Sequence, residues 1–340
     1  MRRVVTSLIV GLLTVALLLL GTVVWWLNRP MPLHLQPGAE VVDLTIEFGT
    51  RAQAVADVAV ASGVDVPVVL LKTWFRLSGQ ARQIKAGSYE VTPGTTPRKL
   101  LNMLVRGEES LKTITLVEGW TFAQVRQALQ KAEQLAPDTR TLSPEAIMEK
   151  LGKPGVHPEG RFFPDTYAYA KGSSDLALLK RANHAMDQRL DAAWSLRSPG
   201  TPLKSADEAL ILASIVEKET GKAADRAQIG GVFTNRLRIG MPLQTDPSVI
   251  YGLGASFDGN LRKVDLQTDT PYNTYTRGGL PPTPIAMPGK AALLAAVQPA
   301  QTKALYFVAR NDGSGASQFS ESLEDHNRAV NHYIRGQQTP

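Results

Sequence analysis

Two glutamates separated by one lysine stand near the end of a segment that should fold as a helix. Ser205 and Glu208 have the spacing of a capping box, in which two side chains satisfy backbone amides at the start of a helix. An apolar run follows, and Gly221 occupies the position that glycine favours after a helix ends. Glu217 and Glu219 therefore fall in the last turn of this predicted helix.

The two carboxylates lie on different faces of that helix. Glu219 follows Val216 by three residues and Ile215 by four, so it extends the buried apolar stripe. Glu217 follows Ala213 by four residues and lies on a more lateral, less apolar face. Burial raises the pKa of a carboxyl group, and the negative end of the helix dipole raises it further. A glutamic acid protonated near neutral pH is what general-acid cleavage of a glycosidic bond requires.

A structural role for Glu219 is the alternative that this pattern leaves open. Glutamates are common near helix ends, and an ion pair with Arg226, Arg236 or Arg238 would equally explain a carboxylate at this position. The segments that follow the helix favour a catalytic role for Glu219.

Two downstream loops concentrate side chains that suit a sugar. Residues 240–252 and 271–285 are rich in proline and combine amides, hydroxyls and aromatic rings. Sugar hydroxyls need hydrogen bonds, and the faces of sugar rings stack on aromatic side chains. Loop packing would account for any one of these residues, but the cluster as a whole favours a carbohydrate site.

Composition excludes several other kinds of chemistry. The chain has 340 residues, 43% of them hydrophobic and 20% charged, which is typical of a folded protein of about two domains. It has no cysteine, so disulfides, thiolate nucleophiles and cysteine-ligated metals are excluded. Its five histidines lack metal-ligand spacing, and a Gly-x-Ser-x-Gly elbow and phosphate-binding loops are absent. The scattered net charge of +6 predicts no nucleic-acid binding, and we expect no metal and no cofactor.

The first thirty residues predict a membrane anchor. Residues 4–27 carry no charged side chain, and about 20 apolar residues span a bilayer core. Arg2 and Arg3 precede this run, which places the N-terminus in the cytoplasm, and Trp25 and Trp26 suit the far interface. A cleaved signal peptide is the alternative, although it would have a shorter apolar region and a small-residue cleavage site. Either reading places the rest of the chain outside the cytoplasm.

Periodicity along the rest of the chain predicts a mixed α+β fold. The first group of elements has the order strand, helix, helix, strand, helix, at residues 41–48, 51–62, 66–77, 84–91 and 98–105. The second group is a strand at 113–116, helices at 121–135, 142–150, 174–194, 205–220 and 229–238, and a structured loop at 155–169.

Several motifs resemble those of the endolytic murein transglycosylase family, also called MltG or YceG-like. They are Ile211–Thr220 (ILASIVEKET), Asn235–Leu237 (NRL), Leu243–Gly252 (LQTDPSVIYG), Tyr272–Tyr275 (YNTY) and Gly279–Pro282 (GLPP). The upstream segments Ile84–Tyr89, Val117–Trp120 and Glu159–Thr166 fit the same pattern. The resemblance extends from the anchor to about Ile334, and its motifs are long and ordered.

The resemblance implies a domain organisation and a location. The expected parts are a cytoplasmic tail (1–6), a single transmembrane helix (7–28), a linker (29–40), a LysM-like glycan-binding unit (41–108) and a YceG-like catalytic domain (113–338) with its active-site helix at 205–220. The protein would sit in the cytoplasmic (inner) membrane, with its catalytic domain on the periplasmic or extracytoplasmic side. Peptidoglycan glycan strands are the expected substrate, and membrane peptidoglycan synthases are candidate partners.

The resemblance also implies an activity, the non-hydrolytic cleavage of the MurNAc–GlcNAc bond within glycan strands. Its acid/base would be Glu219, the residue that the apolar stripe selects independently. The product would carry a 1,6-anhydro end, and the cleavage would limit the length of nascent strands. The candidate substrate-binding residues are Gln244, Thr245, Asp246, Tyr251, Tyr272, Asn273, Tyr275 and Glu217.

The sequence departs from the family pattern at two places. Thr283 stands where the family's Leu-Pro-Pro-Gly-Pro-Ile segment has glycine, and Ser317 replaces the histidine of a His-x-Phe motif. The side chain that would carry any role of that histidine is absent at this position. We expect the remaining His326 to be structural rather than catalytic.

Two other functions remain open at this point. A muramidase would use water and would need a second carboxylate about 5–9 Å from the first. Asp246 and Glu217 are the candidates that lie nearest in sequence. A non-catalytic glycan-binding scaffold, based on the LysM-like unit, is the third reading.

Overall fold

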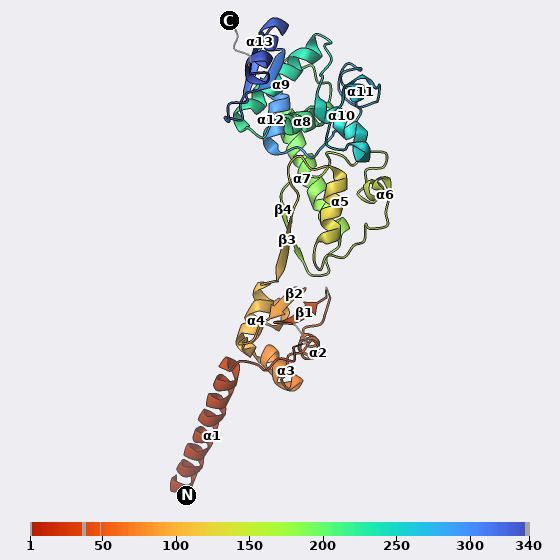
Figure 1. Ribbon diagram of the computed structural model, residues 1–340. Coiled ribbons are helices and arrows are strands. Elements are labelled where there is room, and N and C mark those ends of the chain that lie inside the picture. Colours follow the sequence, from red (N-terminus) through yellow and green to blue (C-terminus); the bar gives the residue numbers. More distant parts are fainter. Residues whose placement is uncertain (1, 36–38, 48, 337–340) are drawn as a thin grey trace. The chain divides into compact units, whose positions relative to one another are not determined.

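The computed structural model describes residues 2–35, 39–47 and 49–336, and for residues 2–8 it describes the backbone alone (Figure 1). The predicted cytoplasmic tail, linker, first strand and C-terminal boundary extend partly outside these residues. The chain divides into two compact units, Met1–Lys112 and Thr113–Pro340. Helices and two-stranded sheets form both units, so the predicted mixed fold is confirmed.

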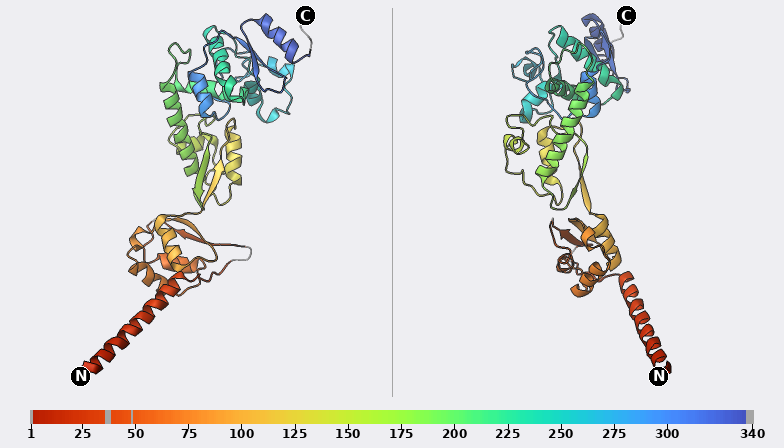
Figure 2. Two further views of the ribbon diagram at one scale, coloured as in Figure 1. Left: turned by 90° about the vertical axis from the view of Figure 1, so that its left-hand side faces the viewer. Right: turned by 180° about the vertical axis from the view of Figure 1, so that it is seen from behind.

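The first unit contains an antiparallel strand pair and the helices around it (Figures 1 and 2). Its elements are α1 (Arg2–Asn28), β1 (Val42–Ile46), α2 (Val55–Ala61), α3 (Val68–Leu77), the 3-10 helix η1 (Ala81–Gln83), β2 (Gly87–Val91) and α4 (Pro97–Arg106). β1 pairs with β2 from Val42 opposite Val91 to Ile46 opposite Gly87. The predicted order of strand, two helices and returning strand is observed. Val42, Leu44 and Ile46 are buried, as their alternation predicted.

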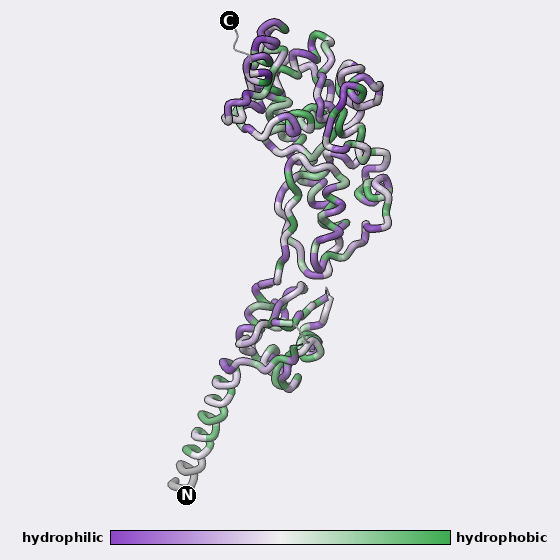
Figure 3. The backbone as a smooth tube through the Cα atoms, viewed as in Figure 1, coloured by the Kyte–Doolittle hydropathy of each residue, from purple (hydrophilic) through white to green (hydrophobic). Residues whose placement is uncertain are grey.

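The apolar helix α1 leads into the first unit through a short packed segment. Its side chains from Ile9 to Trp25 are exposed, and it is long and apolar enough to cross a membrane (Figure 3). Leu27 and Met31, in contrast, are buried, Met31 in the core of the unit. The Met31 amide also donates to the Thr95 carbonyl at 2.9 Å. The chain therefore joins the folded unit within a few residues of the end of the apolar run.

The first half of the second unit is built around a second strand pair. Its elements are β3 (Leu111–Thr115), which begins two residues before the unit boundary, α5 (Phe122–Lys131), α6 (Pro144–Lys150), β4 (Thr166–Ala170) and α7 (Asp175–Ser195). The expected capping box forms at α5, where Thr121 and Gln124 each accept from the other's backbone amide. β4 is a correction, because the sequence predicted a loop over 155–169. Its Thr-Tyr-Ala-Tyr-Ala alternation favours a strand beside β3, and the preceding glycines and prolines obscure that signal.

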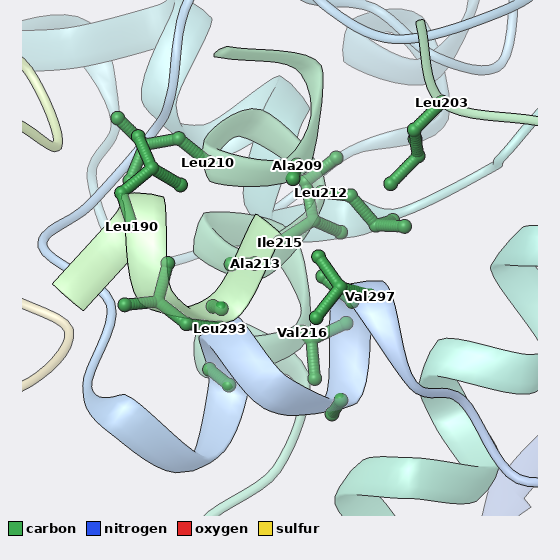
Figure 4. Close-up of a cluster of buried hydrophobic side chains, with 14 of the residues drawn as sticks. Leu190, Leu203, Ala209, Leu210, Leu212, Ala213, Ile215, Val216, Leu293 and Val297 are labelled. Atoms are coloured by element: carbon green, nitrogen blue, oxygen red, sulfur yellow. The ribbon is translucent and has the colours of Figure 1, made fainter. Parts of the chain in front are cut away.

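The second half of this unit packs its helices around α8 (Figure 4). Its elements are α8 (Ala206–Glu219), α9 (Ala223–Arg238), α10 (Asp246–Leu253), η2 (Gly254–Ser256), α11 (Lys263–Gln267), α12 (Lys290–Val297), β5 (Tyr306–Ala309), β6 (Ser317–Ser320) and α13 (Leu323–Tyr333). β5 and β6 pair antiparallel. α8 contacts α7, α9 and α12, and it buries Leu212, Ile215 and Val216 among Leu293 and Val297 of α12. This core fixes the end of α8 that carries the two glutamates.

Three local predictions differ from the structure. α9 begins earlier than predicted. Half of the loop expected before residue 252 is helix α10, which Pro247 helps to start because its fixed φ suits a first helical turn. Gly221 does not adopt the left-handed conformation expected after a helix, and the C-cap of α8 is Thr220 in an extended conformation.

Candidate active site

Glu219 is the last residue of α8, and its carboxyl group meets the segment before α10. Its Oε1 accepts a short hydrogen bond from the Thr245 hydroxyl. Burial raises the pKa of Glu219 to about 7, and the Asp246 carboxylate adds to the rise, while Thr245 and the Arg236 guanidinium oppose it. The direction is the one predicted from the apolar stripe. A carboxyl group with this pKa can both donate and accept a proton near neutral pH.

Buried hydrogen bonds join the two candidate sugar loops behind Thr245. Gln244 has a left-handed backbone with φ of +49°, which residues other than glycine rarely adopt. Its amide donates to the Thr274 carbonyl at 3.0 Å, and the Thr245 amide donates to the Thr274 hydroxyl at 3.0 Å. The Ser248 hydroxyl lies 3.0 Å from the same Thr274 oxygen. These contacts fix the Thr245 hydroxyl against Glu219.

Asp246 and Tyr275 lie beside the same carboxyl group. The Tyr275 hydroxyl donates to Asp246 Oδ1 at 2.5 Å. Burial, Asp246 and then Glu219 all raise the pKa of Tyr275, so these groups share one electrostatic environment. Gln244 and Asp246 are exposed, while Thr245 is buried. The structure thus brings Gln244, Thr245, Asp246 and Tyr275 around Glu219, and their contact with a substrate stays a prediction.

Asn273, another predicted substrate ligand, is only 1% exposed. Its Nδ2 donates to the carbonyls of Asp265, Leu266 and Thr268 at 2.7–3.1 Å, and its Oδ1 accepts from the Tyr275 amide at 2.9 Å. Both ends of the amide are therefore engaged within the protein. This position favours ordering of the loop that carries Tyr275 over direct binding of a sugar.

The three arginines named as possible partners of Glu219 bind elsewhere. Arg236 is buried, and it donates to the carbonyls of Leu305 and Leu243 at 2.7 and 2.6 Å. Arg226 pairs with Glu217, and Arg238 donates to Asn235 and Gly200. Within the described part of the chain, Glu219 has no ion pair. The arginine ion pair that was the alternative for Glu219 is instead made by Glu217.

Glu217 is a buried carboxylate of α8 that bonds to α9 and to the start of α12. Its side chain is 5% exposed, and its partners are polar, on the lateral and less apolar face that the sequence predicted. Oε1 lies 3.3 Å from Arg226 Nη2, and Oε2 accepts from the amide of Gly289, the N-cap residue of α12, at 2.9 Å. Burial raises the pKa of Glu217, and the Gly289 and Arg226 contacts oppose the rise. Its predicted role as a substrate ligand competes with this structural one.

Glu159 is a third buried carboxyl group with a raised pKa, and sequence reasoning gave it no role. Its two oxygens accept from the Phe122 amide at 3.0 and 3.2 Å, and Oε2 also accepts from the Tyr251 hydroxyl at 3.1 Å. Burial raises its pKa to about 7, and those hydrogen bonds limit the rise. The Tyr251 ring meets Tyr272 edge-on at 5.0 Å. The positions of two tyrosines predicted to bind sugar therefore depend on a carboxyl group that is distant in sequence.

The two departures from the family pattern have local contacts. The Thr283 hydroxyl lies 2.8 Å from the Tyr272 hydroxyl, so the residue that replaces glycine adds a hydrogen bond to that tyrosine. The Ser317 amide donates to Asp225 at 2.6 Å. His326 stacks on Tyr306 with ring centroids 5.2 Å apart. This packing agrees with the structural role expected for His326.

Comparison with known proteins places the chain in a family. The YceG-like family matches residues 44–332. The chain belongs to this family. A YceG-like relative from Bacillus subtilis (strain 168), named endolytic murein transglycosylase, is 31% identical over 86% of this chain and 85% of its own length. A protein of the same name from Streptococcus pneumoniae serotype 2 is 28% identical over 86% of this chain, which spans 58% of that longer protein.

A solved structure supports the YceG-like fold. The crystal structure of a yceG-like protein from Listeria monocytogenes has a TM-score of 0.53 and 26% sequence identity, covering 85% of this chain and 99% of that one. The YceG-like match covers α8, the candidate sugar loops and Glu159.

Replacing Thr245 by valine should move the pH dependence of activity. The Thr245 hydrogen bond stabilises the ionised form of Glu219 and lowers its pKa. Without that bond we expect the alkaline decline of glycan cleavage to move up by about one pH unit. Rate measurements between pH 5 and 9 test this. Thr245→Ser retains the hydroxyl and should leave the profile in place, and an unchanged profile in Thr245→Val would contradict the assignment.

Replacing Glu159 by glutamine should flatten the dependence of stability on pH. The folded pKa of about 7 exceeds the ordinary value of 4.5, so the stability contributed by Glu159 is complete below pH 4.5 and is lost as pH rises through 7. The full effect is at most about 3 kcal/mol. Denaturant unfolding at pH 4.5 and pH 8 measures it, with the exposed Glu133→Gln as the matched control. Equal slopes in the two variants would refute the prediction.

Proposed function

We propose that this protein is an endolytic lytic transglycosylase of peptidoglycan with Glu219 as its acid and base. The observation that supports this most directly is the buried Glu219 carboxyl group. Burial raises its pKa to about 7, and it lies beside a loop rich in side chains that suit a sugar. Relatives named endolytic murein transglycosylase, aligned over most of the chain, give the same function. The proposed bond is the β-1,4 linkage from MurNAc to GlcNAc within a nascent strand.

The proposed reaction needs one carboxyl group and no water. Protonated Glu219 donates its proton to the glycosidic oxygen as the bond from that oxygen to C1 of MurNAc breaks. The C6 hydroxyl of the same MurNAc then forms a bond to C1, and the Glu219 carboxylate takes the proton that this hydroxyl releases. The products are a GlcNAc with a free 4-hydroxyl and a 1,6-anhydroMurNAc end. Because the second nucleophile is internal, the water-activating carboxylate of a two-carboxylate glycosidase is unnecessary.

The groups around Glu219 have complementary tasks in this scheme. The Thr245 hydrogen bond and the Arg236 charge stabilise the carboxylate after proton donation, whereas Asp246 favours reprotonation. We assign sugar contacts to exposed Gln244 and Asp246 and to Tyr275, whose hydroxyl bonds Asp246. We also assign ring surface for sugar stacking to Tyr251 and Tyr272, which pack edge-on against each other.

The remaining parts of the chain fit the same proposal. α1 would anchor the protein in the cytoplasmic membrane with its N-terminus in the cytoplasm, because Arg2 and Arg3 precede the apolar run. The unit of strand, two helices and returning strand at 42–91 would act as a LysM-like glycan-binding module. Membrane peptidoglycan synthases are the proposed partners, since they would supply nascent strands at the same surface.

Mass spectrometry of cleaved glycan strands tests the proposal. Purified strands are incubated with the full-length protein in detergent, with wild type beside Glu219→Gln. We expect internal cuts that carry 1,6-anhydro ends in the wild type and none in the variant. Reducing ends would instead indicate a muramidase and point to Asp246 or Glu217 as its second carboxylate. Strand binding without cleavage by either protein would support a scaffold and contradict the proposal.

A further inference from the structure

Helix α3 presents an apolar face that no other part of the described chain covers. Val69 is 66% exposed, Leu70 45% and Leu77 78%, although Leu71 and Phe75 on the opposite side are buried. At 100° per residue, Val69, Leu70 and Leu77 fall within about one third of the helix circumference. They form one stripe together with the exposed Thr73, whose hydroxyl donates to the Val69 carbonyl at 2.8 Å, and we call it the α3 face.

Basic side chains border the α3 face. Lys72 and Arg76 are exposed on the next sector of the same helix. Lys72 pairs with Asp57 at 2.7 Å between exposed side chains, and such a pair contributes little in water. An apolar stripe bordered by lysine and arginine is typical of a helix that lies in a membrane interface, with apolar side chains among the acyl chains and cations at the headgroups.

The position of α3 in the first unit links this face to α1. The Trp74 ring nitrogen donates to the Pro97 carbonyl of α4 at 3.3 Å, and α4 contacts α1. Within this unit, Figures 1 and 2 show α3 at the end from which α1 projects, while β1 and β2 lie toward the other end. Trp26 packs on the same core as Met31.

The length of the apolar stretch of α1 places the first unit, and α3 with it, at the membrane surface. The apolar stretch of α1 from Ile9 to Asn28 has 20 residues, which at 1.5 Å per residue is about 30 Å, the thickness of a hydrocarbon core. The Arg29 guanidinium then lies over the Trp25 ring at 4.9 Å, an arrangement suited to the headgroup region. Met31 is already buried in the folded unit. The unit thus begins at the membrane surface, with no length of free chain to lift it away.

We propose that the α3 face docks on the outer leaflet of the membrane that holds α1, inserting Val69, Leu70 and Leu77 below the headgroups. This inference rests on the proposed anchoring by α1. Two attachments, one spanning and one interfacial, fix the orientation of the first unit to the bilayer, which a single helix alone does not. Anionic headgroups complement Lys72 and Arg76.

Single-cysteine spin labelling tests the docking, and the natural chain is already free of cysteine. The full-length protein, one copy per nanodisc of phosphatidylethanolamine and phosphatidylglycerol, is labelled in turn at Leu77→Cys, Val69→Cys and Glu47→Cys. Glu47 is exposed directly after β1 and serves as the matched control. A fourth label at Leu17→Cys, on exposed α1, reports the anchor itself. We expect the ratio of collisions with oxygen to collisions with a water-soluble nickel complex to be several-fold higher at positions 69 and 77 than at position 47.

The outcomes separate this inference from the anchoring on which it rests. Labels at 69 and 77 that match position 47, while the Leu17 label reports lipid, would overturn the docking and leave the anchor intact. A Leu17 label that meets the nickel complex freely would refute both. Protection of position 77 only in discs that hold two copies would assign the α3 face to a second copy of the chain and also overturn the proposal.

Discussion

Glu219→Gln is expected to reduce glycan cleavage by a factor of about 10² to 10⁴, the range that one general acid contributes. Glutamine retains the shape and can still accept the Thr245 hydrogen bond, but it has no proton to give to a glycosidic oxygen. Initial rates on purified strands measure the loss. Glu208→Gln is the matched control, since it changes a carboxylate in the first turn of the same helix and should leave the rate unchanged.

The variant should also remain folded, and at alkaline pH it should be more stable than wild type. The folded pKa of Glu219, about 7, lies above the ordinary 4.5, so the stability contributed by this group is complete below pH 4.5 and is lost as pH rises through 7. Removing the carboxylate at pH 8 then raises the free energy of unfolding by up to about 3 kcal/mol. Denaturant unfolding at pH 8 checks this sign. If Glu219→Gln were less stable than wild type at pH 8 as well as inactive, its loss of activity would be explained by unfolding.

The wild-type rate should follow the same ionisation. An acid that must be protonated becomes unavailable above its pKa, so cleavage by the free enzyme should decline above about pH 7, tenfold for each further pH unit. The alternative of a non-catalytic scaffold predicts no such decline of the rate with pH, because a scaffold does not cleave glycan strands.

The raised pKa of Glu219 could be predicted from the sequence because part of its environment is local. Ile215 and Val216 lie four and three positions earlier on the same helix, and helix geometry places them on the face of Glu219. Its polar neighbours, Thr245, Asp246 and Arg236, come from later segments that this pattern does not show. The structural contacts of Glu217 could not be predicted, for the opposite reason. The groups that bury and pair it, Arg226 and Gly289, come from α9 and the start of α12, and no spacing within α8 reports them.

Glu159 shows where single-sequence reasoning ends. Its burial and raised pKa depend on Phe122, 37 residues earlier, and on Tyr251, 92 residues later. Nothing in the periodicity around residue 159 records those partners. The same limit applies to the two loops. Their composition predicted polar side chains near Glu219, but it did not distinguish exposed Gln244 from Asn273, whose amide is hydrogen-bonded to the backbone of α11 and its flanking residues. Local sequence patterns predict helices and strands, whereas the roles of individual side chains depend on contacts with residues that are distant in sequence.

Gly230→Ala is expected to destabilise the second unit by about 2–3 kcal/mol, the cost typical of overpacking a core. Helix propensity alone predicts the reverse, because alanine stabilises a helix interior by about 0.5–1 kcal/mol relative to glycine. At Gly230 of α9, however, an added Cβ would lie 2.3 Å from the Ala295 carbonyl oxygen of α12, and a backbone atom cannot rotate away. α9 and α12 would have to separate.

Separation of these helices should also reach the active site. α9 carries Arg236, whose charge acts on Glu219, and the N-cap of α12 binds Glu217 on the helix that ends at Glu219. We therefore expect lower activity together with a lower melting temperature, both measured on the purified protein. Gly278→Ala is the matched control, because that glycine has an ordinary φ and open space around its Cβ position, so its stability should change little. A Gly230→Ala protein as stable as the control would mean that α9 and α12 can move apart without loss, and α8 would then need another explanation for its fixed position.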